Sequence, residues 1–162
     1  MSIYRSVRAV TGASGDGPVD WNAVGDAAKA ATDPGDIDVP ANERAAYADD
    51  VGDARDRIRR VTALDFDLPD TVEIQSRHHW IDANIATFER VMAPIESRAE
   101  YIPGVARMVN TGSMALALSF LSNNVLGQYD PLLLADGDDH KLYFVRPNIQ
   151  RVAETLDVSY PR

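Results

Sequence analysis

Apolar residues recur every three or four positions along most of this chain, a spacing that predicts amphipathic helices. The longest such pattern covers residues 104–131. Its first half carries an apolar stripe, and its second half, Met114 to Leu121, is apolar on nearly every side. A helix that is apolar all round is buried, whereas a membrane span would need about 20 apolar residues. We therefore expect one long, buried central helix at about 105–127, ended by Gly127 and Pro131.

Four further helices are expected to pack around the central one. Asp20 is a suitable N-cap for the first of them, because its carboxylate can accept a hydrogen bond from the first helical turn. Pro94 should kink the third helix or end its regular part, and Asn148 should cap the last. The predicted ranges are about 21–32, 41–64, 79–99 and 149–156.

Strand patterns are short and few. Residues 6–10 and 71–74 each predict a short strand. The apolar runs 132–134 and 142–145 flank an acidic stretch, 135–140, which predicts a β-hairpin with a long turn. The predicted fold class is therefore mainly α: a helical domain around one long central buried helix, with a small β-hairpin or short sheet.

Length and composition narrow the class of protein. The 162 residues suit one domain, and we expect 1–18 to be a flexible leader and 19–162 a single helical domain. The acidic residues are 19 Asp and 6 Glu, whereas the basic ones are 14 Arg and 2 Lys, giving a net charge of −9. An Asp-rich, Lys-poor surface is typical of proteins from concentrated salt, where the Debye length falls to roughly 3 Å. The composition therefore indicates a cytoplasmic protein of a halophilic archaeon.

The same composition excludes several functions. Nucleic-acid binding needs clustered Lys and Arg, which a chain of net charge −9 offers only in an Asp-interleaved run at 53–60. The chain has no cysteine, so thiolate metal sites are excluded. The first residues show no charged leader followed by an apolar core, and no apolar run suits a membrane, so we expect neither secretion nor a membrane partner.

Three stretches invite a chemical interpretation. His78, His79 and Asp82 form the one conceivable metal cluster, but adjacent histidines point in different directions and zinc needs three or four ligands. The acidic turn at Asp136–His140 has calcium-like spacing without the closing Glu. The glycine-rich run 11–17 lacks the Gly-Lys-Ser/Thr ending of a phosphate loop. Solvated turns, caps and surface histidines are the favoured interpretation of all three.

Four segments occur in the order that is found in one protein family, and together they extend from residue 19 to residue 149. The segments are Val19–Trp21, Trp80–Asn84, Leu118–Pro131 and Leu142–Ile149. In these segments the chain resembles the zincin-like metallopeptidases, whose members are often labelled as hydrolases associated with deazaflavin-coenzyme biosynthesis. The resemblance implies structural roles for a set of signature residues: Trp21, Trp80, Asp82, Asn84, Gly127, Gln128, Tyr129, Asp130 and Asn148.

The resemblance covers nearly the whole chain but implies only the N-terminal portion of the family's fold. The family's zinc-binding helix, with its His-Glu-x-x-His motif, is expected after the segment that ends at Arg162, and this sequence contains no such motif. It therefore implies no catalytic or metal-binding residue in this chain, and zinc only in a full-length member. Strand 142–145 (Leu142, Tyr143, Phe144, Val145) is expected to be closest in role to a substrate-facing edge.

Two functional classes follow from this comparison. The chain is either the scaffold portion of a zincin-like hydrolase or a non-catalytic helical module that pairs with another chain. A shortened protein, a split gene and a degenerate member are all compatible with the sequence. In each case the expected partner is the missing C-terminal portion or a second protein chain, with a homo-oligomer as an alternative, because an uncovered apolar helix favours association.

Overall fold

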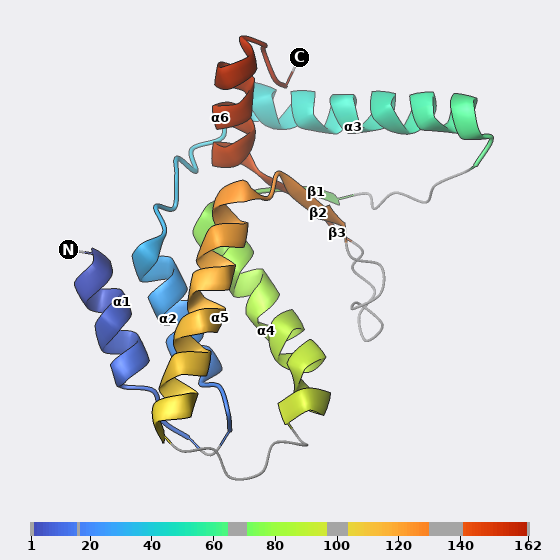
Figure 1. The fold of residues 1–162 in the computed structure, drawn as a ribbon. Helices are drawn as coiled ribbons and strands as arrows, with labels where there is room; N and C mark the ends of the chain where they lie inside the picture. Colours follow the sequence, from blue (N-terminus) through green and yellow to red (C-terminus); the bar gives the residue numbers. More distant parts are fainter. Residues whose placement is uncertain (1, 16, 65–70, 97–103, 130–140, 162) are drawn as a thin grey trace. The chain divides into compact units, whose positions relative to one another are not determined.

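The computed structural model describes residues 2–15, 17–64, 71–96, 104–129 and 141–161. These residues contain six helices and one small three-stranded sheet (Figure 1). The predicted fold class, mainly α with a short sheet, is therefore confirmed. The chain forms two compact units: unit 1 comprises residues 1–35 and 77–124, and unit 2 comprises 36–76 and 125–162. The division into a leader and a single domain stays a prediction.

Unit 1 is a group of four helices, and α2 lies at its core. The helices are α1 (Ser2–Thr11), α2 (Trp21–Ala31), α4 (Arg77–Glu96) and α5 (Gly104–Asn124). Small side chains on α2, among them Ala27 and Ala28, are almost completely buried because α1, α4 and α5 all contact this helix. Asp20 caps α2 as predicted, since its carboxylate accepts a hydrogen bond from the Ala23 backbone N–H. Pro94 lies inside α4, as expected.

Two hydrogen bonds join the capping residues at the two ends of α2 to side chains of α5. At the start of α2, the backbone N–H of Asp20 donates to the Thr111 hydroxyl at 3.0 Å. At its end, the hydroxyls of Thr32 and Ser119 lie 2.8 Å apart. These contacts use polar groups within an otherwise apolar interface, so they fix the register of the two helices.

Helix α5 is less buried than its composition suggested. Its buried residues form one stripe with spacing four, three and four: Thr111, Ala115, Leu118 and Ser122. The opposite side is solvent-exposed, with exposed fractions of 70% at Val105, 59% at Val109, 70% at Leu116 and 68% at Phe120. The prediction of a fully buried helix was therefore wrong. The neighbouring helices of unit 1 cover one face of α5 and leave the other uncovered.

Helix α1 replaces the short strand that was predicted at residues 6–10. Ile3, Val7 and Val10 are spaced four and three residues apart, which is the helical period, and this pattern overrides the alternation seen locally. Ser6 fastens the helix to α2 by donating from its hydroxyl to the Ala27 carbonyl at 3.1 Å. Residues 2–11 thus form a helix of unit 1 in the structure.

Unit 2 contains a mixed sheet with strand order β1-β3-β2. Strand β3 (Lys141–Val145) pairs in parallel with β1 (Thr71–Gln75) and antiparallel with β2 (Gly127–Tyr129). The predicted β-hairpin had its other arm at 132–134, which lies outside the described residues. The idea that Leu142–Val145 forms a substrate-facing edge was wrong, because β3 is the central strand and its backbone groups pair on both sides.

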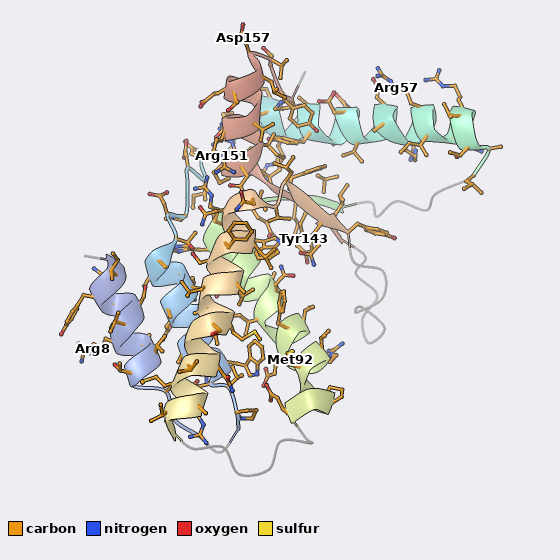
Figure 2. All side chains as sticks on the ribbon, in the orientation of Figure 1. Arg8, Arg57, Met92, Tyr143, Arg151 and Asp157 are labelled. Carbon is orange, nitrogen blue, oxygen red and sulfur yellow. The ribbon has the colours of Figure 1, made fainter. Side chains whose placement is uncertain are left out.

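Two helices complete unit 2. Helix α3 (Ala41–Thr62) has one buried residue among those described, Tyr47, and its second half projects charged side chains into solvent around Arg57 (Figure 2). Helix α6 (Arg146–Leu156) begins three residues earlier than expected, directly after β3. Asn148 is therefore not the N-cap. It lies within the first turn, fully buried.

Candidate functional site

The signature residues of unit 1 lie where α2 and α4 begin, and most of them are buried. Trp21 and Trp80 are buried, and the Trp21 indole N–H donates to Glu96 Oε1 at 3.2 Å. Asn84 is also buried and donates to the Trp80 carbonyl at 2.8 Å. Asp82, in contrast, is exposed and pairs with Lys29 at 2.7 Å.

The signature residues of unit 2 lie around the sheet. The Asn148 amide donates to the Val125 carbonyl at 2.7 Å, which fastens α6 to the segment that precedes β2. Gly127 is required by close packing, because a Cβ atom there would lie 2.7 Å from the Tyr143 carbonyl oxygen. Gln128 and Tyr129 follow it in β2, whereas Asp130 lies outside the described residues.

The histidines do not form a zinc site in the described part of the chain. His78 places its Nε2 atom 2.7 Å from the Thr32 carbonyl oxygen, so this nitrogen is occupied by a hydrogen bond. His79 is exposed, and His140 lies outside the described residues. Over the described ranges no group of three or more His, Asp and Glu side chains could hold a metal ion. Because zinc takes three or four protein ligands, these residues do not fit it.

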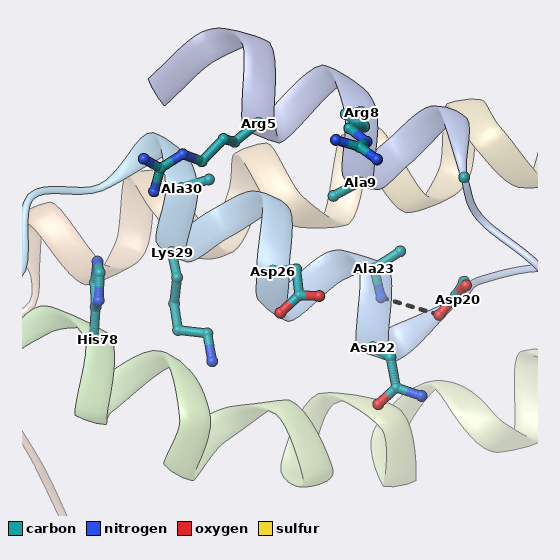
Figure 3. A pocket seen from close by; sticks show the side chains of 11 residues that line it. Arg5, Arg8, Ala9, Asp20, Asn22, Ala23, Asp26, Lys29, Ala30 and His78 are labelled. Atoms are coloured by element: carbon teal, nitrogen blue, oxygen red, sulfur yellow. Dashed lines mark hydrogen bonds between the residues drawn. The ribbon is translucent and has the colours of Figure 1, made fainter. Parts of the chain in front are cut away.

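A groove of about 760 Å³ lies along α2 in unit 1, bounded by α1 and α4 (Figure 3). Arg5 and Arg8 contribute from α1, and His78 contributes from α4. The floor belongs to α2 and includes Asp26 and Lys29. The groove thus brings charges of both signs together from three helices.

Two charged groups of this groove, Asp20 and Lys29, already have structural roles. Burial raises the pKa of Asp20, but hydrogen bonds from the Ala23 and Ser14 backbone N–H groups outweigh it and hold that pKa below the usual value. Lys29 pairs with Asp82 across α2 and α4. No nucleophile beside a general base is found among the groove residues, so the arrangement is a mixed-charge surface without a catalytic constellation.

The strongest electrostatic cluster of unit 2 is centred on Arg146, a residue that the sequence interpretation missed. Its guanidinium donates to both carboxylate oxygens of Glu43, at 2.6 and 2.9 Å, and lies 3.4 Å from Asp36 Oδ2. These contacts raise the pKa of Arg146, with the Glu43 hydrogen bond as the main cause. The sequence does contain one signal for the role of Arg146. This residue lies directly after an apolar strand and before Pro147, and a charge that is buried there needs an oppositely charged partner.

Tyr47 lies next to this cluster and is fully buried against two aromatic rings. Its ring centroid is 5.6 Å from that of Phe144 and 5.4 Å from that of Tyr160. Burial, assisted by the negative charge of Glu43, raises the pKa of Tyr47 to about 12. The phenol therefore stays protonated at physiological pH, so it serves as part of the core and not as a base.

Comparisons with known proteins agree with the segments found in the sequence. A model of the zincin-like metallopeptidase family matches residues 19–161. A crystal structure from Chloroflexus aurantiacus, described as "a putative hydrolase with a novel fold", is similar with a TM-score of 0.72 and 29% sequence identity. The similarity covers 88% of this chain and 47% of that one, so this chain spans about half the length of that protein. No curated protein matches the chain.

The described helices were also compared with the requirements of a membrane span. Within the described ranges, none combines sufficient length with sufficient apolar character to cross a bilayer.

Proposed function

The chain belongs to the family of zincin-like metallopeptidases, and we propose that it supplies the scaffold portion of such an enzyme. The zinc-binding helix is contributed by a different portion of the fold, either elsewhere in a longer protein or in a second chain. In this proposal the present residues hold the fold together and bind no metal.

One observation carries this proposal. The fold of the Chloroflexus protein is matched over nearly all of this chain, yet the match accounts for 47% of that protein. More than half of the Chloroflexus protein therefore lies outside the part that this chain matches. The sequence agrees, because its three histidines, His78, His79 and His140, do not occur in a His-Glu-x-x-His motif.

The chemistry is divided accordingly. Two histidines of the motif helix would hold zinc in that other portion, where the ion would supply a bound water with a pKa of about 7 and a Lewis acid for the scissile carbonyl. In this proposal the residues of the present chain support the fold and orient its helices. Asn84 and Asn148 are buried, and their amides donate to the Trp80 carbonyl within α4 and to the Val125 carbonyl before β2.

The test is co-expression of this chain with the portion of the Chloroflexus protein that the match leaves out. We expect a 1:1 complex that contains zinc and hydrolyses a generic peptide or ester substrate, while this chain alone does neither. As a positive control, the two portions of the Chloroflexus protein are co-expressed as separate chains. If these two portions fail to associate, the idea of a divisible scaffold and zinc portion is wrong.

A second candidate function is a helical interaction module whose partner is unrelated to zinc chemistry. The uncovered apolar face of α5 favours association of some kind. The two candidates differ in the partner: a natural partner isolated with the chain carries a His-Glu-x-x-His motif in the first case and lacks it in the second.

We also propose that the chain works in the cytoplasm of a halophilic archaeon, as its 19 Asp and 2 Lys suggest. With a net charge of −9, the folded state repels itself at low ionic strength. Salt screens this repulsion, because the Debye length falls from about 10 Å at 0.1 M to about 3 Å at 1 M. The melting temperature should therefore rise between 0.1 and 2 M KCl, and a constant or falling value would contradict the assignment.

A further inference from the structure

Unit 1 has an apolar groove that the proposed scaffold role does not explain. This α1–α5 groove has a volume of about 380 Å³ and lies where α1 and α5 meet above α2. Its walls are almost entirely apolar: Val7 and Val10 from α1, and Met108, Val109, Gly112 and Leu116 from α5. Three of these side chains are largely exposed, with exposed fractions of 54% at Val7, 59% at Val109 and 70% at Leu116.

The groove continues as a stripe along α5. Val105, Val109, Leu116 and Phe120 are separated by four, seven and four residues, so they lie on one helix face. At 1.5 Å per residue the stripe is about 22 Å long. Monomeric proteins seldom leave such a continuous apolar surface in water, and a surface of this kind marks an interaction site.

The charge distribution supports the same interpretation. Helix α5 has one charged residue, Arg107, in its 21 residues, and α1 has Arg5 and Arg8. Neither helix has an Asp or Glu, although the chain contains 25 acidic residues. Depletion of charged residues is characteristic of an interface core. The composition of this surface is therefore that of a protein–protein interface.

Gly112 interrupts the stripe and leaves a notch between Val109 and Leu116. A Cβ atom at Gly112 would lie 3.4 Å from Val10 Cγ1, which is ordinary van der Waals contact, so the notch is bounded by α1. An apolar side chain of a partner can enter the groove at this point. Buried apolar anchors of this kind dominate the affinity of interfaces.

We propose that the α1–α5 groove and its stripe receive an amphipathic helix from the zinc-binding portion of the fold. This inference rests on the proposed function. It identifies the occupant because the Chloroflexus protein has more than half of its chain outside the match, and that portion needs a surface on which to bury its own apolar face. Helices dock in grooves through apolar side chains that recur on one helix face, and the α5 stripe presents such a face, with intervals of four and seven residues.

The test uses the co-expressed pair described above, with three variants of this chain. Leu116→Glu and Val109→Glu each place a charge in the groove. Ala117→Glu places the same charge on the same helix at an exposed position that does not line the groove. We expect the first two variants to weaken association by tenfold or more, and Ala117→Glu to change it by less than twofold. Circular dichroism confirms that all three variants remain helical.

Each outcome bears on one of the two proposals. If both groove variants bind as strongly as the original chain, the zinc-binding portion docks elsewhere and this inference is wrong, while the proposed function survives. The inference is also overturned if the original chain forms a dimer that Leu116→Glu dissociates, since a second copy then covers the groove. It is equally overturned if the two Chloroflexus portions associate with each other but the second does not bind this chain. Hydrogen exchange supplies a second measurement: α5 should become protected in the complex.

Discussion

The two units of this protein are stabilised in different ways. In unit 1 the buried area is distributed over many small contacts, because α2 presents Ala23, Val24, Ala27 and Ala28 to three neighbouring helices. In unit 2 the stabilising contacts are concentrated at Arg146 and Tyr47, each of which joins segments distant in sequence. Single substitutions should therefore harm unit 2 more than unit 1, although unit 2 contains α3, which has one buried residue among those described.

Arg146→Met should cause the largest loss of stability. It removes the guanidinium and leaves the Glu43 carboxylate, whose side chain is 17% exposed, without its ion-pair partner. Breaking a buried pair from one side costs about 3–5 kcal/mol. Urea unfolding measures the loss, and hydrogen exchange should locate it in unit 2.

Two matched variants make this prediction specific. Arg55→Met breaks an exposed pair with Asp56 and should change stability by less than about 1 kcal/mol. Adding Glu43→Leu to Arg146→Met should recover much of the loss, because no unpaired charge then remains buried. If Arg146→Met is as mild as Arg55→Met, the concentration of stability in unit 2 is disproved.

Gly127→Ala should have the next largest effect. The new Cβ atom would lie 2.7 Å from the Tyr143 carbonyl oxygen, a backbone atom that moves only with strand β3. Overpacking of this kind costs about 1–3 kcal/mol. The control is Gly52→Ala in α3, where nothing lies within 4 Å, and there the better helix propensity should stabilise by up to about 1 kcal/mol. Equal effects at both positions would show that β2 tolerates a shift.

Asp20→Ala should be the mildest of these changes, with a loss of about 1 kcal/mol, because it removes one helix cap in unit 1. The pH dependence has a definite sign. Since the folded-state pKa of Asp20 is below its ordinary value of 3.8, the carboxylate stabilises the fold above that pH, and the contribution is lost as pH falls through the folded pKa. Urea titrations at neutral pH and in acid should therefore show a smaller difference between original and variant in acid. A difference that is constant with pH would contradict the role of the charge.

The sequence predicted the positions of the helices better than it predicted their burial or the order of the strands. Helical spacing and the Asp20 cap located α2, α3 and α5 within a few residues of their observed ends. It could not show that one face of α5 is uncovered, because an apolar residue gives the same signal whether its neighbour is present or absent. Strand order also escaped prediction: the parallel pairing of β1 with β3 joins residues about 70 positions apart, and no local pattern encodes it.

Among the candidate site residues, some could likewise be found from the sequence and others only from the structure. Resemblance located Trp80, Asn84 and Asn148, and the structure shows each of them buried in a hydrogen-bonded contact. It gave no sign of Arg146, whose importance depends on Glu43, a residue on a separate helix more than 100 positions away. A side chain whose role is set by a distant partner is recognised in the fold, not in the sequence.

The central claim is that this chain is a scaffold that leaves zinc binding to another portion. It is tested most directly by equilibrium dialysis of the purified chain against micromolar zinc, followed by metal analysis. The account predicts far less than one zinc per chain, because no zinc-competent cluster occurs among the residues that the structure describes. One zinc bound tightly per chain, and lost on replacement of His78 or His79, would contradict it.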